Sequence, residues 1–390
     1  MLGVTATAAV HAAGFGTDAL WGAVCEGHSA LRAEKLEGRQ EVCHIGAVAN
    51  IEDVSLPPTL AMADCRNHRL AWMALQDSGF REAVETALSR HGAQRIGLLL
   101  GSSTSGIRET EAAYAQRRAS GRWPEGFDWT RTHAFGGLTR FVSEAIGVQG
   151  PAMVVTTACS SSAKVFLVAQ RWIEAGFIDA AVVGGVDSLC LSTLHGFDSL
   201  QLLSSEPCRP FDEARNGISI GEAAGFALLE PGAAPLIFAG GGESSDAYHM
   251  SSPHPQGRGA VIAMRSALES AGIRPTDIGY INAHGTATPS NDRSEAAALL
   301  EVFGAHAVPV SSTKGVTGHT LGAAGIVEAI VCLQALRAQR IPPVTNLLKP
   351  DPTLAIDLIT TPRDHTFQYA LSNSFGFGGS NCALVFARGR

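Results

Sequence analysis

Cys159 is the residue whose surroundings most clearly favour chemistry. It lies in VVTTACSSSAKV, where an apolar run ends and a helical pattern begins. A turn from a strand into a helix exposes one side chain at the edge of a sheet, and the helix N-terminus behind it offers free N–H groups and positive potential. Both features favour a thiolate over a thiol and can hold an oxyanion. The pattern is therefore typical of a nucleophilic cysteine.

Two histidines further along the chain lie in loops of small residues. His284 occurs in NAHGTATPSND, directly after the apolar run IGYI, and His319 occurs in STKGVTGHTLGAAG, ahead of another helical pattern. An isolated histidine is usually structural, but two in such loops, together with Cys159, favour a catalytic site. A Cys/His/His metal site is the alternative. Because the three residues lack the short paired spacing of metal ligands, we expect no metal.

Lys314 and Glu328 flank the second histidine. Lys314 stands before His319, and Glu328 follows it inside the predicted helix. The two could form a buried ion pair that positions the histidine loop. They could equally be a surface lysine and an unrelated glutamate, and the pattern alone does not decide between these interpretations.

The segment LSNSFGFGGSNCALVF contains a glycine-rich loop, residues 376–379. A dinucleotide-binding loop follows a strand and opens a helix, whereas this loop runs into a strand. It therefore predicts no dinucleotide site. We expect a flexible loop, beginning at Gly376, that supplies a backbone N–H and is gated by Phe375 or Phe377.

Short apolar runs alternate with longer helical patterns and must carry these residues. The predicted strands, each expected to be buried on both faces, are 96–101, 152–158, 180–186, 225–230, 279–285 and 382–387. Residues 160–176 show the spacing of a helix with one packed face. Buried strands that alternate with helices indicate layers of an α/β fold.

A weak internal repeat suggests two related halves. Residues 156–176 and 316–336 are both loops of small residues that run into an apolar helix. A chain that repeats one α/β unit produces such a pattern. We place the join near 231–242, which predicts an N-terminal half, 1–236, with the nucleophile and a C-terminal half, 237–390, with both histidines. Residues 105–140 are more polar and predict an excursion from the core.

The composition describes a large globular protein. The 390 residues are 45% hydrophobic and 17% charged, with a net charge of −7. This excludes general disorder and makes nucleic acid an unlikely partner. No Lys or Arg precedes the N-terminal apolar stretch, which favours a first core strand over a signal peptide. Without an uninterrupted apolar run of about 18 residues, no membrane span is expected, and the predicted location is cytoplasmic.

The remaining cysteines predict no disulfide framework or zinc motif. None forms a C-x-x-C pair, and in a chain of this size we expect reduced, mostly buried thiols. These residues are Cys25, Cys43, Cys65, Cys190, Cys208, Cys332 and Cys382.

Together, TACSSSA, NAHGTATPSND, STKGVTGHTLGAAG and SNSFGFGGSNCALVF resemble the elongating β-ketoacyl-acyl-carrier-protein synthases, the group with a Cys-His-His site. ESSDAYHMSSP (243–253) and CRPFDEARNGISIGEAAG (208–225) resemble the same group, and the resemblance covers residues 2–388. It implies the thiolase fold, in which two similar α/β halves form a five-layered αβαβα sandwich that is normally dimeric.

The resemblance also implies a role for each matching residue. It makes Cys159 the nucleophile that accepts the acyl group, and it makes His284 and His319 the residues that act on a malonyl thioester. The other implied roles are an ion pair that supports the site (Lys314 and Glu328), a gate (Phe377) and contacts to the phosphopantetheine arm (Thr286 and Thr288). No cofactor is expected to be bound, because phosphopantetheine arrives on the carrier protein.

The implied reaction suits these residue types. Cys159 attacks an acyl thioester, with its own N–H and that of Phe377 forming the oxyanion hole. Decarboxylation of malonyl-carrier protein leaves an enolate, to which neutral His284 and His319 donate hydrogen bonds. A helix start beside His319 would help to keep that ring neutral. The carbanion then attacks the acyl group, which yields a β-ketoacyl product two carbons longer.

Carrier protein is acidic, so the resemblance implies a basic docking patch. Arg66, Arg69 and Arg209 match positions where such patches occur, although ordinary solvated arginines are an equally open interpretation.

Residues 101–111 and 191–205 look more like ketosynthases of the aryl-polyene type than like housekeeping fatty-acid enzymes. The first strand is also less β-branched than is usual for the family. We expect residues around Ile107 and in 191–205 to determine primer and chain length.

Three alternatives follow from the same fold. A coenzyme A-dependent thiolase would use a second catalytic cysteine, and the paired histidines favour decarboxylation instead. A non-catalytic partner of the chain-length-factor type would lack the nucleophile, whereas Cys159 is present. The chain could still be a ketosynthase that is active only with such a partner. The sequence leaves open a homodimer or a heterodimer with a chain-length-factor-like ketosynthase.

Overall fold

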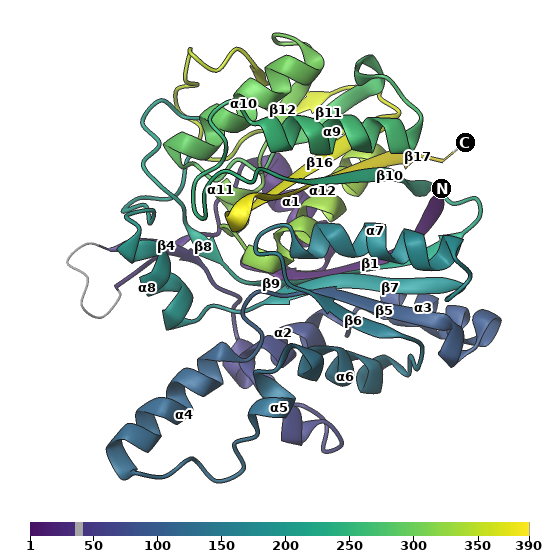
Figure 1. The fold of residues 1–390 in the computed structure, drawn as a ribbon, viewed down its shortest axis with the longest axis vertical. Coiled ribbons are helices and arrows are strands. Elements are labelled where there is room, and N and C mark those ends of the chain that lie inside the picture. The colour runs from purple at the N-terminus through teal and green to yellow at the C-terminus, as the bar shows by residue number, and fades with distance from the viewer. Residues whose placement is uncertain (36–41, 390) are drawn as a thin grey trace.

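A large mixed β-sheet forms the framework of the molecule. The computed structural model describes residues 1–35 and 42–389. Within these residues the main sheet has the order β14-β12-β11-β16-β17-β10-β1-β9-β7-β5-β6, and the short β2 (Gly14–Phe15) pairs with β1. The two parts of this sheet join only where Leu2 and Gly3 pair with Phe238 and Ile237. Figure 1 shows the two parts as separate layers.

The first part contains five main strands. They are β1 (Leu2–His11), β5 (Ile96–Gly101), β6 (Ala152–Val155), β7 (Ala180–Asp187) and β9 (Ala223–Pro231). β5 runs parallel to β6 and β7, whereas β9 is antiparallel to both β7 and β1.

The second part repeats this arrangement. Its strands are β10 (Leu236–Ser245), β11 (Ile278–Asn282), β12 (Pro309–Ser311), β16 (Tyr369–Gly376) and β17 (Ser380–Arg388), with β14 (Asp357–Leu358) added at the edge. β11 is parallel to β12 and β16, and β17 is antiparallel to β16 and β10. If the five main strands of each part are numbered 1 to 5 along the chain, both parts have the same spatial order, 3-2-4-5-1. This order corresponds to β6-β5-β7-β9-β1 in the first part and to β12-β11-β16-β17-β10 in the second.

Two helices fill the space between the two sheet layers (Figure 1). They are α7 (Ser161–Glu174) and α12 (Ala324–Ala338), and each follows the third strand of its part. Both belong to one hydrophobic core with residues of the two sheets. These are the helices of the predicted internal repeat. The division into residues 1–236 and 237–390 stays a proposal.

Helices also cover both outer faces. The first part is covered by α2 (Arg66–Ala74), α3 (Ser78–His91) and α6 (Phe135–Ile146), and the second by α9 (Arg258–Ala271) and α10 (Pro289–Phe303). The order helix, sheet, helix, sheet, helix is visible in Figure 1. The predicted five-layered thiolase arrangement is confirmed.

The innermost helix is apolar around its whole circumference. Every residue of α12 from Ala324 to Leu336 is buried. A helix that is surrounded by other elements needs no polar face. The window Leu321–Ala338 is long and apolar enough to cross a membrane, but 89% of it is buried inside the molecule, as expected for a core helix.

The strand predicted at 152–158 differs from its prediction. β6 ends at Val155, and Ala152 and Met153 are exposed rather than buried. β6 is the last strand in the order of the sheet, so within the described residues it pairs only with β5. The expectation of burial on both faces was wrong because periodicity does not reveal which strand lies at the edge.

Smaller elements surround the core. A three-stranded sheet of β3 (Arg32–Glu34), β4 (Cys43–Gly46) and β8 (Ile220–Gly221) lies near α8 (Leu191–Ser199), and Figure 1 shows α4 (Ile107–Ser120) and α5 (Trp129–Thr132) projecting from the body. The projection agrees with the predicted excursion. The remaining elements are α1 (Thr17–Glu26), α11 (Lys314–Thr317), β13 (Arg340–Ile341) and β15 (Arg363–Asp364).

Candidate active site

Cys159 lies in a tight turn between β6 and α7. Ala158, just before it, has a φ of +53°, which a side chain other than glycine adopts rarely. Ser161 holds this turn, because its hydroxyl donates to the carbonyl of Ala158 at 2.6 Å and accepts the N–H of Thr157 at 2.9 Å. The predicted position of Cys159, between strand and helix, is confirmed.

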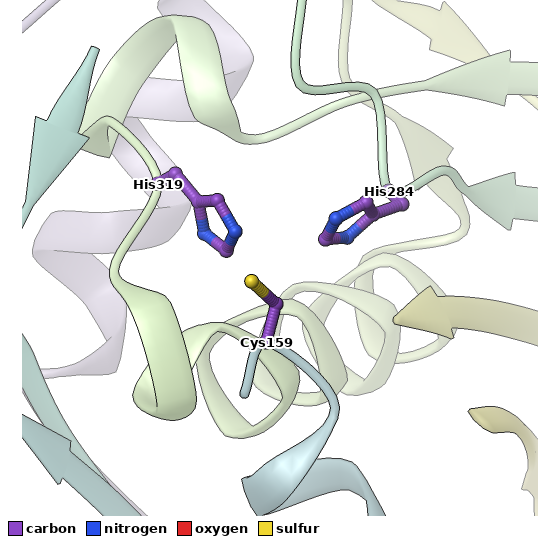
Figure 2. Close-up of side chains that lie close together, drawn as sticks. All are labelled: Cys159, His284 and His319. Atoms are coloured by element: carbon purple, nitrogen blue, oxygen red, sulfur yellow. The ribbon is translucent and has the colours of Figure 1, made fainter. Parts of the chain in front are cut away.

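Two loops from the second part of the sheet bring the histidines to this turn. His284 follows β11, and His319 lies between α11 and α12. Figure 2 shows both rings directed toward the sulfur of Cys159. The sulfur of Cys159 and one ring nitrogen of each histidine all lie within 4.8 Å of one another, and all three side chains are buried. The structure therefore brings together the three residues that the sequence singled out.

The Cys159 thiol is protonated in this environment. Burial raises its pKa to about 12, although the charge of Lys314 and the N–H of Phe377 act in the opposite direction. Removal of water outweighs these groups that favour the thiolate.

His319 has a defined tautomer. Its Nδ1 accepts the N–H of Leu321 at 3.2 Å, so the proton of the neutral ring is on Nε2. Burial, followed by the charge of Lys314, lowers the pKa of this ring well below its usual value. Nε2 is buried without a hydrogen-bond partner among the described residues. His319 therefore presents an unused N–H donor to the site.

His284 has the same tautomer for a different reason. The ammonium of Lys314 lies 3.3 Å from its Nδ1, so this nitrogen accepts and Nε2 carries the proton. Burial lowers the pKa of His284 well below its usual value, and Lys314 and His319 add to this effect. The two rings are nearly perpendicular, with centroids 5.2 Å apart. Both histidines are thus neutral donors.

The predicted ion pair between Lys314 and Glu328 is buried. The side chains are each 2% exposed, and the ammonium contacts Glu328 Oε1 as well as the carbonyl of His284. The hydroxyl of Ser374 donates to the second oxygen of Glu328 at 3.3 Å. The interpretation as a surface lysine with an unrelated glutamate was wrong. α12 places Glu328 directly behind the histidine loops.

Two buried carboxylates near the site were not identified from the sequence. Glu295, on α10, accepts the N–H groups of His284 and Gly285, each at 2.8 Å, and burial raises its pKa to about 7. Asp187, at the end of β7, accepts the N–H of Gly322 at 2.6 Å. An acidic residue at the end of a wholly apolar strand was a usable signal for Asp187, whereas α10 has no comparable pattern around Glu295.

A pocket opens onto the three residues. Its walls include parts of the 243–253 segment and of α8, the glycine-rich loop and the loop after His284. The expected site residues among its lining are Phe375, Gly376, Phe377, Thr286 and Thr288, together with Cys159 and both histidines. Ile107 does not line it, although Phe197 and Leu202 from the 191–205 segment do.

The glycine-rich loop covers the nucleophile. The N–H of Phe377 is directed at the Cys159 sulfur and lowers its pKa. The Phe377 ring is 36% exposed and lies 5.4 Å from the ring of Phe197. Gly378 donates its N–H to the carbonyl of Met250 at 2.8 Å, which ties the loop to the 243–253 segment. These contacts place an aromatic side chain in the wall of the pocket.

The predicted docking arginines do not form a free basic patch. Arg66 is only 6% exposed and pairs with Glu222 and Glu52, so its assignment to a docking surface was wrong. The sequence conceals this because Glu222 is distant along the chain. Arg69 and Arg209 are partly exposed, but each pairs with carboxylates of its own neighbourhood.

The hydrogen bonds around the site disfavour the metal interpretation. Zinc-binding histidines donate their second N–H to a carboxylate or carbonyl, which leaves the other nitrogen free to coordinate. Here, donors occupy Nδ1 of both rings and leave the proton on Nε2. The charge of Lys314 would also repel a cation. This pattern favours histidines that donate hydrogen bonds from Nε2, and the expectation of no metal stays a prediction.

The fold and site define a thioester-condensing acyltransferase of the thiolase-like class. Two family models match the chain, Beta-ketoacyl synthase, N-terminal domain, over residues 65–234 and Beta-ketoacyl synthase, C-terminal domain, over residues 237–348. A chain in the solved structure of the ketosynthase ApeO in complex with its chain length factor ApeC from Xenorhabdus doucetiae matches with a TM-score of 0.91 and 38% identity, covering 99% of this chain and 98% of that one.

Curated relatives agree with this similarity. The chain is 34% identical to Nodulation protein E of Rhizobium meliloti (strain 1021), over 96% of each protein. It is 36% identical to 3-oxoacyl-(acyl-carrier-protein) synthase 2 of Staphylococcus aureus, over 78% of this chain and 81% of that protein. The chain belongs to the β-ketoacyl synthase family. The predicted family, fold and class of acyltransferase are confirmed.

Neither His284 nor His319 should titrate in the neutral range. Because burial and Lys314 lower both pKa values, we expect the ring ¹⁵N signals of both to keep the pattern of a neutral, Nε2-protonated imidazole from about pH 8 to about pH 5.5. NMR of histidine-labelled protein measures this directly. The same protein unfolded in urea provides the reference. A midpoint near the ordinary value in the folded protein would contradict the assignment.

Proposed function

We propose that this β-ketoacyl synthase condenses malonyl-carrier protein with an acyl group held on Cys159. The observation that carries the proposal is the buried cysteine faced by two neutral histidines whose Nδ1 atoms are both occupied by donors. Such a site supplies a nucleophile and two N–H donors on buried side chains. These are the groups that a decarboxylative condensation needs.

Acylation of Cys159 is the first step. The sulfur attacks the carbonyl of an acyl thioester, the new thioester forms on Cys159, and the phosphopantetheine thiol leaves. The proton of the Cys159 thiol ends on that leaving thiol, so no net proton is taken up. N–H groups from Cys159 and Phe377 stabilise the negative oxygen of the tetrahedral intermediate, and the Nε2–H groups of the histidines stabilise the thiolate during transfer.

Decarboxylation is the second step. Malonyl thioester loses carbon dioxide and leaves an enolate whose oxygen needs hydrogen-bond donors. His284 and His319 each present Nε2–H to the pocket, and because both are already neutral donors, no proton has to move before they act.

Condensation completes the cycle. The enolate carbon attacks the acyl group on Cys159, the Cys159–acyl bond breaks, and Cys159 leaves as a thiolate that takes up one proton from solvent to restore the thiol. The product is a β-ketoacyl thioester two carbons longer on the carrier protein. Thr286 and Thr288, whose hydroxyls lie 2.9 Å apart in the pocket, would contact the phosphopantetheine arm.

The thiolase alternative lacks its second cysteine. Its candidate, Cys382, is fully buried in β17 and does not line the pocket, and burial raises its pKa. The position that faces Cys159 is occupied by His319 instead. This arrangement favours malonyl decarboxylation over condensation of two acyl-coenzyme A molecules.

A basic patch at the end of α4 suits an acidic carrier protein. Arg117, Arg118 and Arg122 are exposed, and among the described residues none of them forms an ion pair with a carboxylate. Arg117 instead lies over the ring of Trp123. Unpaired surface charges attract an oppositely charged partner more strongly than charges that are already neutralised, as those of Arg69 and Arg209 are.

The free edge of β6 is the surface that we assign to a partner subunit. An unpaired strand edge with exposed Ala152 and Met153 is a template for a strand of another chain. This partner is a second copy or a chain-length-factor-like ketosynthase. The solved complex of ApeO with its chain length factor supports the second possibility.

We assign the chain to an aryl-polyene-type pathway in the cytoplasm. The similarity to ApeO and the resemblance of residues 101–111 and 191–205 support this assignment. Phe197 and Leu202 from the second segment line the pocket, where they would contact the acyl chain.

Substitution of the nucleophile should separate the two half-reactions. Cys159→Ala removes the acyl acceptor but leaves both histidines, so acyl adducts and condensation product should vanish while malonyl decarboxylation continues. Intact-mass analysis after incubation with acyl-carrier proteins, together with assay of released carbon dioxide, measures both.

Cys382→Ala is the matched control and should keep the adduct and the product. Condensation by the Cys159→Ala variant would refute the assignment of the nucleophile. Loss of product in the Cys382→Ala variant would favour the thiolase. Carbon dioxide release without an adduct in the unmodified protein would point to a missing partner subunit.

Charge reversal at the end of α4 should weaken carrier-protein binding. We expect Arg118→Glu with Arg122→Glu to raise KM for malonyl-carrier protein about tenfold at low salt, with kcat little changed. KM for malonyl-pantetheine, which lacks the protein, should stay the same. Reversal of Arg69 and Arg209 is the comparison. A larger effect there would move the docking surface to those residues.

A charge on the edge of β6 should prevent assembly. We expect Met153→Asp to dissociate the homodimer, or the complex with a co-expressed chain-length-factor-like subunit, because an interface strand would have to bury the carboxylate. Light scattering gives the mass of each species. Leu300→Asp, at a similarly exposed position on α10, is the control. An unchanged mass of the Met153→Asp variant would exclude this edge as the interface.

A further inference from the structure

We propose that Asp187 is a positioning residue that links the Cys159 turn to the His319 turn and so determines where His319 points. Asp187 ends β7 and is fully buried. It touches neither the pocket nor a reacting atom, because it is not among the pocket-lining residues. The inference rests on the proposed function for its consequences, whereas the contacts themselves do not depend on it.

One side of the Asp187 carboxylate holds the loop after β5. Oδ1 accepts the hydroxyl of Ser102 at 2.7 Å and the N–H of Ser103 at 2.8 Å. Thr104 donates both its N–H, at 2.9 Å, and its hydroxyl, at 3.0 Å. The same Thr104 hydroxyl accepts the N–H of Ser188 at 3.1 Å, which ties the loop back to the end of β7.

This loop continues directly to the nucleophile. The hydroxyl of Ser103 donates to the carbonyl of Ala158 at 3.3 Å, and Ala158 is the residue with the left-handed backbone before Cys159. Its carbonyl also accepts the N–H and the hydroxyl of Ser161. Asp187 therefore supports the Cys159 turn through one intervening residue.

The other side of the carboxylate holds the turn of His319. Oδ2 accepts the N–H of Gly322 at 2.6 Å, in the 3-10 turn η5 (Leu321–Ala323). The residue before Gly322 is Leu321, whose N–H holds Nδ1 of His319 and fixes its tautomer. Leu321 itself has a φ of +54°, so this turn is costly unless its neighbours hold it.

Only a carboxylate can satisfy all of these groups. Every partner of Asp187 is a donor, and an ionised carboxylate is an acceptor at both oxygens. Burial raises the pKa of Asp187, while the N–H of Thr104, the hydroxyl of Ser102 and the N–H groups of Ser103 and Gly322 lower it. The donors come from two segments, so the charge holds both segments to one point.

Gly322 fits closely against this carboxylate. A Cβ at position 322 would lie 2.8 Å from Asp187 Oδ2 and 2.8 Å from the Ser103 hydroxyl oxygen. Alanine would therefore push the His319 turn away from Asp187 without changing any charge. This gives a second, independent way to break the same link.

Asp187→Asn tests the link with nearly the same volume. The asparagine oxygen remains as acceptor for the donors of residues 102–104, and its amide group then faces the N–H of Gly322, donor against donor. We expect carbon dioxide release from malonyl-carrier protein to fall about 100-fold, the scale of a small misplacement of a catalytic group. Acylation of Cys159 should fall less than decarboxylation, because the donors of residues 102–104 keep their acceptor and the N–H groups of Cys159 and Phe377 stay in place.

Gly322→Ala should likewise lower decarboxylation more than acylation. This second variant tests the link if the Asp187→Asn protein does not fold. Glu230→Gln is the control for loss of a buried carboxylate. Glu230 is 7% exposed and pairs with Arg90 and His91 at the far end of β9. Its substitution should leave both half-reactions of the folded protein unchanged.

The ¹⁵N signals of His319 provide a readout that a purely structural role would not move. In both test variants the ¹⁵N chemical shift of His319 Nδ1 should change from that of a hydrogen-bonded acceptor to that of a free one. The ¹⁵N chemical shifts of His284 should stay the same. This measurement needs no substrate, so it judges the link even if the unmodified protein proves inactive and the proposed function fails.

Two results would overturn the inference. The first is an unchanged His319 spectrum and unchanged decarboxylation in folded Asp187→Asn and Gly322→Ala proteins. The second is an equal loss of acylation and decarboxylation that follows the loss of thermal stability alone.

Discussion

The buried ammonium of Lys314 is the interaction on which the site depends. It contacts the carboxylate of Glu328, Nδ1 of His284 and the carbonyl of His284. An isolated buried charge is very unfavourable, so Glu328 is required as its counterion. Burial lowers the pKa of both histidines, the remaining positive potential of Lys314 lowers it further, and the same potential opposes the rise in the pKa of Cys159. One lysine therefore acts on three other groups of the site, in addition to the larger effect of burial.

The duplicated fold explains how residues so distant in sequence meet. Each half carries a helix after its third strand, and the two helices, α7 and α12, pack in one core between the sheets. Cys159 precedes α7 and His319 precedes α12, so the repeat places the nucleophile and one histidine at equivalent positions. His284 follows β11 in the second half. Close backbone contacts then hold the His319 loop, since a Cβ on Gly46 or Gly221 would collide with the carbonyl of Thr317.

Local patterns predicted much of the fold and of the site. Buried strands such as β5 and β7, helix α7 and the positions of Cys159, His284 and His319 follow from periodicity and from small-residue loops. The errors have a common cause, because they depend on which distant segments meet. Glu222 made Arg66 an interior residue, and the order of the strands exposed β6. Glu295 acts through backbone N–H groups that no side-chain pattern reveals.

The tautomers explain why neither histidine acts as a general base. In acylation the thiol proton ends on the departing phosphopantetheine sulfur, and in condensation Cys159 leaves as a thiolate that takes up one proton from solvent before the next acylation. No step asks a histidine to accept a proton, but each creates negative charge on sulfur or oxygen. If a histidine ring were protonated, its Nδ1 would carry a proton and could no longer accept the hydrogen bond that orients the ring. Burial and Lys314 prevent this, so both rings remain donors throughout the cycle.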